Sequence, residues 1–478
     1  MNPGNAGGAK GGRKAEAFEE TNREAANSPP VPTVDKQGEE DLWERYGAKR
    51  GVWSQKMLAA LQSGVKGKVW FSLMDKVCGE RTLQVAWEQV RSKAGACGVD
   101  GISVERFGKD SQNRLLAVKE HLSEGSYRPQ AVKRVWIPKA GSASLRPLGI
   151  PTVRDRVVQT ALKMAMEPIF EREFAPHSYG FRPGRGCKDA LRRVEQLLQS
   201  GLVHVVDVDI RSYFDTIPHE KLMSRVRERM ADGRVLGLIE SFLKAGVMEQ
   251  GEKMAPSQPG EEGTPQGGVI SPLLANVYLN PLDWLMSQTG LEMVRYADDM
   301  VILCAEAASA STALQRLRGW MEQAGLELHP QKTKVVDMGQ PGAHFDFLGY
   351  RFWRGKTNGR IRRFIRPKSA KSIRGRLKPL TRRTNGQSLE MVIARINPVL
   401  EGVYGYFKHA SAAALEELDG WVRGRLRGIL RWRRGGEGRG RGQDHQRWPN
   451  HYFAKLGLHS LKQTQDQEIA SLRVGDTC

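Results

Sequence analysis

The sequence predicts an α+β fold for the middle of the chain, followed by a basic helical region. Residues 204–210 (HVVDVDI) form a β-branched run, and residues 293–304 place two apolar runs around Ala297-Asp298-Asp299, which predicts a hairpin. Apolar periodicity predicts helices over residues 154–170 and 187–200. Because helices alternate with strands, this pattern taken alone also leaves an α/β fold open.

Length and charge bound the class of protein. The chain has 478 residues with a net charge of +21 and 40% hydrophobic residues, which excludes a collagen-like or fully disordered chain and predicts roughly two to four domains. Residues 351–478 carry 28 Lys and Arg against 10 Asp and Glu, whereas residues 1–350 carry 46 against 43. The basic surface therefore belongs to the last quarter of the chain and predicts a polyanionic partner, most simply a nucleic acid.

The five cysteines include no C-x-x-C pair, and their number is odd, which fits a reducing cytosol. No apolar run approaches the roughly 20 residues that span a bilayer, so we expect no membrane partner. Residues 1–45 lack the features of a signal or transit peptide and predict a disordered leader. Residues 46–120 predict a helical extension, interrupted by a break at residues 95–101.

From residue 127 to 150, short strand-like runs alternate with Pro and Gly. After about residue 368 the pattern is helical and basic, and residues 435–443 (GGEGRGRGQ) predict a flexible link. There is no internal repeat.

Carboxylates lie at the ends of the two strongest strand signals. Asp209 ends one apolar strand, and Asp298 with Asp299 lies at the hairpin tip. A carboxylate at the end of an apolar strand is costly unless it binds a cation or a partner. Converging carboxylates suit Mg²⁺, which prefers oxygen ligands. The alternative is a solvated turn, in which Asp is common.

Six sequence motifs, in order, resemble those of reverse transcriptases. The hairpin Tyr296-Ala297-Asp298-Asp299 is similar to their Y-x-D-D box. The others are residues 146–151 (RPLGIP), 181–186 (FRPGRG), 209–215 (DIRSYFD), 263–276 (GTPQGGVISPLLAN) and 345–350 (FDFLGY). Residues 397–407 (NPVLEGVYGYF) resemble the maturase or thumb domain of group II intron-encoded proteins. The resemblance covers roughly residues 70 to 460.

The resemblance implies a right-hand polymerase with fingers, a palm with a split β-α-β sheet, and an α-helical thumb that continues into the maturase domain. The expected boundaries are fingers and palm over 121–350, thumb and maturase domain over 351–434, and a linker and DNA-binding tail over 435–478. The resemblance makes Asp209 and Asp298 the ligands of two Mg²⁺ ions and Asp299 their catalytic neighbour. Asp207, on the same strand face, has no family role and is interpreted as structural.

The resemblance also assigns the nucleotide contacts. Phe214 matches the position of a bulky ring that would clash with a ribose 2′-OH and so favour dNTPs. Gln266 matches a contact to the incoming nucleotide, and Lys139 and Arg146 match positions that hold the triphosphate. Either Lys332 or Lys334 would act as the general acid that protonates the leaving pyrophosphate. The residues do not decide between the two lysines.

The basic region predicts an amphipathic helix with Leu415, Leu418, Val422, Leu426 and Ile429 on one face. Arginines around it and beyond it are the expected contacts to RNA or DNA phosphates: Arg423, Arg425, Arg427, Arg431, Arg433, Arg434 and Arg447. Residues 447–453 and 457–461 resemble the DNA-binding tail of one bacterial group. Many relatives carry an HNH nuclease with Cys pairs after this point. No such pairs follow here, so we expect the type without that domain.

The expected function is RNA-directed DNA synthesis together with binding of the protein's own group II intron RNA, for splicing and for target-primed insertion into DNA. The expected setting is the bacterial cytoplasm, as a ribonucleoprotein associated with the nucleoid. Alternatives are a retron or diversity-generating reverse transcriptase, and a maturase that only binds RNA for splicing. A nucleic-acid-packaging protein would explain the charge but not the motif-rich, nearly neutral middle.

Overall fold

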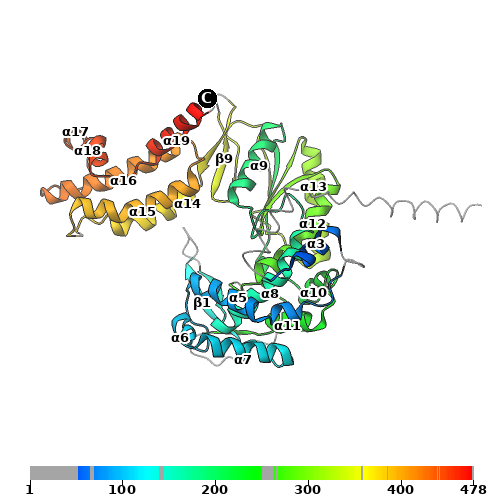
Figure 1. The fold of residues 1–478 in the computed structure, drawn as a ribbon. Helices are drawn as coiled ribbons and strands as arrows, with labels where there is room; N and C mark the ends of the chain where they lie inside the picture. The colour runs from blue at the N-terminus through cyan, green and yellow to red at the C-terminus, as the bar shows by residue number, and fades with distance from the viewer. Residues whose placement is uncertain are drawn as a thin grey trace, which may run out of the picture.

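The computed structural model describes residues 52–64, 69–138, 145–249, 262–264, 267–356, 359–384, 386–438, 440 and 442–475. The predicted leader lies outside these ranges. Within them, no helix is both long enough and apolar enough to cross a membrane. The mixed helix and strand content confirms the α+β prediction, with a body of helices and sheets and a separate group of basic helices (Figure 1).

The central sheet has four antiparallel strands in the order β5-β6-β3-β7. They are β3 (His204–Asp209), β5 (Glu292–Tyr296), β6 (Asp299–Cys304) and β7 (Lys334–Asp337). Alternation along β3 sends Val206 and Val208 to one face and Val205, Asp207 and Asp209 to the other. The register pairs Asp209 directly with Asp299, so the sheet brings together carboxylates that are 90 positions apart.

Helices cover both faces of this sheet. On the Val206 face lie α12 (Ser271–Gln288) and α13 (Ala307–Ala324), which share one apolar core with the N-terminal helices. On the Val205 face lies α9 (Cys187–Gln199), which belongs to a second core that continues into the C-terminal helices. The central sheet is therefore packed on both of its faces.

The N-terminal body is mostly helical and contains a small sheet. Antiparallel strands β1 (Val132–Pro138) and β2 (Leu145–Ile150) form it, with β4 (Val247–Met248) parallel to β1. The predicted helix over residues 154–170 is confirmed as α8 (Val153–Glu171), which is almost wholly buried. The surrounding helices are α3 (Gln55–Ser63), α4 (Met74–Val77), α5 (Glu80–Lys93), α6 (Val104–Gly108), α7 (Ser111–Glu124), α10 (His219–Arg227) and α11 (Gly233–Leu243).

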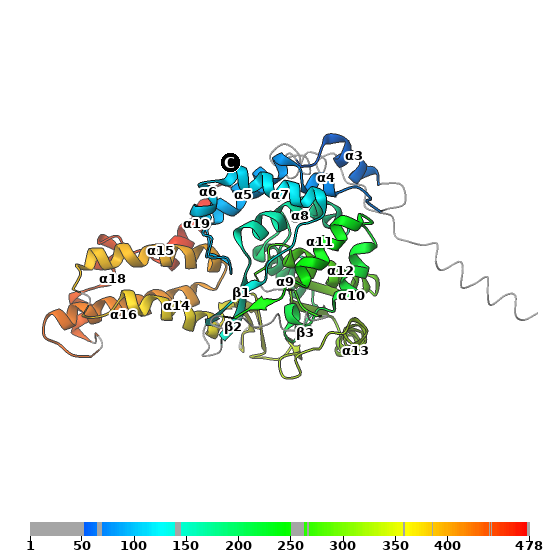
Figure 2. The same ribbon diagram turned by 90° about the horizontal axis from the view of Figure 1, so that it is seen from below.

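A second antiparallel sheet, in the order β10-β9-β8, links the central sheet to the C-terminal helices. Its strands are β8 (His344–Phe347), β9 (Tyr350–Arg354) and β10 (Ile361–Ile365). Helices α14 (Pro367–Leu380), α15 (Leu389–Phe407) and α16 (Ala412–Arg433) follow. Figures 1 and 2 both show these three helices side by side, extending away from the body. The apolar face predicted for residues 415–429 is buried, as expected.

The predicted tail packs against α16 through α17 (Gln443–Arg447), α18 (Asn450–Lys455) and α19 (Leu461–Gly475). Trp448, Phe453 and Leu461 are buried in the second core. The carboxylate of Asp419, in α16, accepts hydrogen bonds from Leu461 N and Lys462 N at the start of α19. Residues 442–475 thus belong to the same packed unit as α16.

Candidate active site

The three predicted carboxylates meet at one end of the central sheet. Asp209 ends β3, Asp299 opens β6, and Asp298 lies in the turn between β5 and β6. Burial raises the pKa of Asp298, and the charge of Asp209 raises it further. Burial also raises the pKa of Asp299 to about 7, with the charges of Asp298 and Asp207 adding to it. Burial, and then the neighbouring negative charges, thus disfavour ionisation of Asp298 and Asp299, and a bound cation would relieve this cost.

The segment before β7 holds Asp209 and supplies a cation. His329 N donates to Asp209 O at 2.8 Å, and Asp209 N donates to Thr333 Oγ1 at 3.3 Å. The Lys332 Nζ atom lies 3.0 Å from Asp209 Oδ1. Lys334 instead approaches Asp207, with 4.0 Å between Nζ and Oδ2. The structure therefore separates the two lysines that the sequence left equivalent: only Lys332 reaches the predicted metal ligand.

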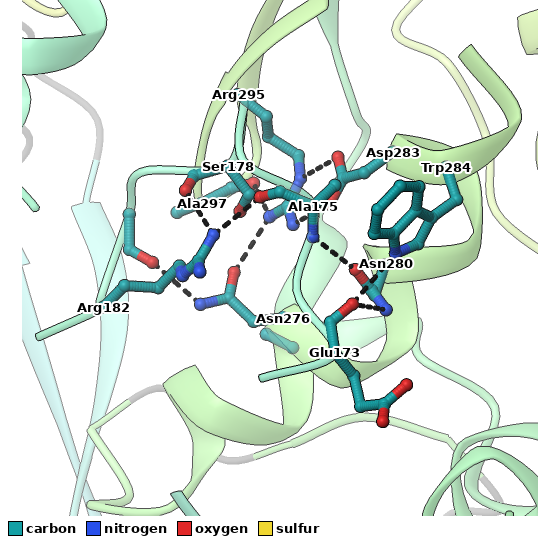
Figure 3. Close-up of polar contacts among 12 residues, drawn as sticks. Glu173, Ala175, Ser178, Arg182, Asn276, Asn280, Asp283, Trp284, Arg295 and Ala297 are labelled. Carbon is teal, nitrogen blue, oxygen red and sulfur yellow. Dashed lines mark hydrogen bonds and ion pairs between the residues drawn. The ribbon is translucent and has the colours of Figure 1, made fainter. Parts of the chain in front are cut away.

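A buried ion pair supports the turn formed by residues 296–299, called here the catalytic turn. Arg295, in β5, is fully buried and pairs with Asp283 of α12. Its Nη1 donates to Asn276 Oδ1 at 2.9 Å and to Ala297 O, inside the turn, at 3.0 Å (Figure 3). Burial disfavours the charged form of Arg295, but the charge and hydrogen bonds of Asp283, together with the charges of Tyr213 and Asp298, outweigh burial, and the pKa of Arg295 is raised. Ala297 has a left-handed backbone (φ 60°), which this bond holds.

The segment from 175 to 182 packs directly on the catalytic turn. Tyr179 N donates to Arg295 O at 2.9 Å, and Arg295 N donates to His177 O at 3.1 Å. A Cβ atom on Gly180 would lie 2.2 Å from Ala297 N, so only glycine allows this approach. Asn276 Nδ2 donates to Gly180 O at 2.7 Å and so joins this segment to the ion pair.

Arg182 anchors the same segment from its other end. Its Nη1 donates to the carbonyls of Ala175 and Ser178 at 2.7 and 2.8 Å (Figure 3). Its guanidinium also pairs with Glu171 at 2.8 Å.

Sequence reasoning missed the roles of Arg295, Asp283 and Gly180. A signal for the first was present, because a charged residue inside the apolar strand at residues 293–296 demands a buried partner.

Two families match the chain. Residues 137–352 match the family described as reverse transcriptase (RNA-dependent DNA polymerase). Residues 370–448 match the group II intron, maturase-specific domain. Protein YkfC of Escherichia coli (strain K12) is 36% identical over 299 residues, covering 54% of this chain and 76% of that protein. The chain belongs to the group II intron-encoded reverse transcriptases.

A further relative is the group II intron-encoded protein LtrA of Lactococcus lactis subsp. cremoris. It is 34% identical over 255 residues, which cover 52% of this chain and 42% of LtrA. The chain thus matches less than half the length of LtrA. A solved chain of the partial Cas6-RT-Cas1–Cas2 complex covers 52% of this chain and 42% of its own length, at 21% identity and a TM-score of 0.34.

Reverse transcriptases use divalent metal ions, and the donor set here fits one. Asp209 and Asp298 are near enough for their charges to interact. Among the described residues no three His, Cys, Asp or Glu side chains group as metal ligands. Two carboxylates with substrate phosphates completing the shell are what Mg²⁺ commonly uses in phosphoryl-transfer sites.

Of the predicted nucleotide contacts, Phe214 and Arg146 lie within the described residues. Phe214 belongs to the short 3₁₀ helix η4 (Tyr213–Asp215); it is half-buried and packs against the first core. Phe214 O accepts a hydrogen bond from Thr264 N at 2.7 Å, which ties the loop at 263–264 to η4. Arg146 is exposed on β2, opposite Ile137. Lys139 and Gln266 lie outside the described residues.

The seven arginines predicted to contact nucleic acid differ in how exposed their side chains are. Arg434 and Arg447 are exposed, Arg433 is exposed and donates to Gln387 O, and Arg423 is half-buried. Arg425 and Arg431 are half-buried and donate to Thr381 and Asp444, respectively.

The prediction for Arg427 is wrong, because Arg427 is buried. Its Nε donates to Trp448 O at 2.9 Å, and its Nη2 donates to Asn450 Oδ1 at 2.8 Å. The α17 and α18 region covers this side of α16, which the helical pattern of α16 alone does not reveal.

Proposed function

We propose that the protein copies RNA into DNA and also binds the RNA of its own group II intron, promoting splicing and target-primed insertion into DNA. Its substrates would be dNTPs and a primer on an RNA template, and its partners the intron RNA and target DNA. The proposed polymerase activity is supported by one observation above all. Asp209, Asp298 and Asp299 converge at one end of the central sheet, within the reverse transcriptase domain.

In this proposal Asp209 and Asp298 hold two Mg²⁺ ions. When bound, they would lower the pKa of the attacking primer 3′-OH and stabilise the leaving pyrophosphate. Asp299 shapes the turn, since Leu348 N donates to its Oδ2 at 3.4 Å. Lys332 is the better candidate for the proton donor to pyrophosphate, because its ammonium already lies at Asp209. Phe214 would exclude a ribose 2′-OH from the nucleotide site.

The proposed binding of intron RNA is supported by the maturase domain and its arginines. A cavity of about 350 Å³ at the far end of α16 is lined by Arg431, Arg434, Arg447 and Trp448, among others. Guanidinium groups that line a cavity suit a phosphate backbone. We propose this cavity as part of the nucleic-acid surface, together with Arg423, Arg425 and Arg433. The net +18 of residues 351–478 predicts that RNA affinity falls steeply with salt.

The test replaces Asp298 and Asp299 together by Ala. Extension of a DNA primer on an RNA template should be lost, because the variant lacks a metal ligand and its neighbour, while intron RNA binding measured by filter retention should persist. Glu322→Ala, an exposed carboxylate on α13, is the matched control and should extend at the wild-type rate. Wild-type extension by the double variant would show that these carboxylates are not catalytic.

A further inference from the structure

A strained two-residue loop in the second sheet is bonded to the catalytic turn. Phe347 of β8 pairs with Tyr350 of β9, so the loop that connects these strands consists of Leu348 and Gly349. Both loop residues have a left-handed backbone, with φ 46° and 80°. Such a loop favours Asn-Gly, and a bulky leucine in it is under strain. Strained residues persist where the surrounding structure holds them, and they cluster at functional sites.

The backbone of Leu348 is bonded in two directions. Its N–H donates to Asp299 Oδ2, in the catalytic turn, at 3.4 Å, and its carbonyl accepts a bond from the Tyr406 hydroxyl at 2.8 Å. Tyr406 belongs to α15, within the maturase-specific domain, whereas Leu348 and Asp299 belong to the reverse transcriptase domain. The bond to Asp299 is longer than most N–H···O bonds, so a small displacement of Leu348 would break it.

A second tyrosine bond joins the same two elements. The Tyr350 hydroxyl donates to Tyr406 O at 2.6 Å, and the Tyr350 side chain is fully buried. A Cβ atom on Gly349 would lie 3.7 Å from atoms of Tyr406 and of Phe407, so the loop lies directly against the end of α15. Two hydroxyl bonds thus join α15 to the β8–β9 hairpin. Of these two, the bond from Tyr406 ends on the residue that reaches Asp299.

We propose that Tyr406 is a positioning residue for DNA synthesis. By holding the carbonyl of Leu348, it keeps Leu348 N on Asp299, the carboxylate next to the proposed metal ligand Asp298. Catalytic groups have to be held within about 0.5 Å of the productive geometry, and supporting hydrogen bonds do this. The role rests on the proposed polymerase function and adds to it a side chain that the maturase domain supplies to the polymerase site.

The experiment compares Tyr406→Phe with Tyr350→Phe as the matched control, because each removes one hydroxyl from the same interface. Single-turnover extension of a DNA primer on an RNA template gives the maximal rate and the half-saturating concentrations of primer–template and dNTP. Tyr406→Phe should lower the maximal rate by about 3- to 10-fold, the scale of one lost hydrogen bond, and leave both half-saturating concentrations unchanged. Tyr350→Phe should extend at the wild-type rate. Phenylalanine fills the same space as tyrosine, so urea unfolding should show that both variants are folded.

Hydrogen–deuterium exchange followed by mass spectrometry tests the bond to Asp299 without turnover. The peptide that contains Leu348 should exchange faster in Tyr406→Phe than in Tyr350→Phe, and Asp299→Ala should give the same faster exchange. The proposal is overturned if Tyr406→Phe extends at the wild-type rate, if Tyr350→Phe slows extension equally, if the defect appears only in the half-saturating concentrations, or if exchange at Leu348 is unchanged. Absence of extension by the wild-type protein would instead overturn the proposed polymerase function, so the two failures are distinguishable.

Discussion

The buried pair of Arg295 and Asp283 makes the sharpest stability prediction. Their side chains are 0% and 2% exposed, and Arg295 Nε donates to Asp283 Oδ1 at 2.7 Å. Asp283→Ala would leave a guanidinium without its counter-charge in a place that water does not reach. Two unit charges 4 Å apart attract by about 4 kcal/mol at an effective dielectric constant near 20. Breaking such a pair from one side typically costs about 3–5 kcal/mol.

The assay is urea unfolding followed by tryptophan fluorescence, with the free energy extrapolated to zero urea. Glu327→Ala is the control: it removes the partner of Arg211, and both of those side chains are 61% exposed. Because exposed pairs contribute about 0–1 kcal/mol, the control should barely change stability. Replacing both buried partners, as Arg295→Met with Asp283→Leu, should recover part of the loss. If Asp283→Ala were no more destabilising than Glu327→Ala, the pair would not support the turn as argued.

Three other predictions concern the reaction and its supporting backbone. Lys332→Ala should slow single-turnover extension by about 10²–10⁴-fold, as expected for a lost general acid, and Lys334→Ala should not; equal losses would count against the assignment. Phe214→Ala should raise the ratio of rNTP to dNTP incorporation, and an unchanged ratio would remove the gate role. Gly180→Ala should destabilise the protein and slow extension, since its Cβ would meet backbone at 2.2 Å. Gly319→Ala, on an open helix position, should instead stabilise by about 1 kcal/mol, and similar effects at the two glycines would refute the close-contact argument.

Much of the fold and the core of the site could be read from the sequence. The β-branched run of Val205, Val206 and Val208 predicts a strand, and the period of two puts Asp207 and Asp209 on the same face of it. The order of the motifs around Asp209 and Asp298 identified the family and its carboxylates. These signals are local, since each depends on residues a few positions apart.

Tertiary structure decided what depends on contacts between distant segments. Lys332 and Lys334 are equivalent by pattern, and only the packing of their segment against β3 brings Lys332 to Asp209, 123 positions away. Arg427 follows the same helical pattern as its neighbours, yet the chain after α16 returns to bury it. Gly180 meets the catalytic turn across more than 100 positions. The physical reason is the same in each case: burial and pairing depend on what the fold brings against a residue, and no local period encodes that partner.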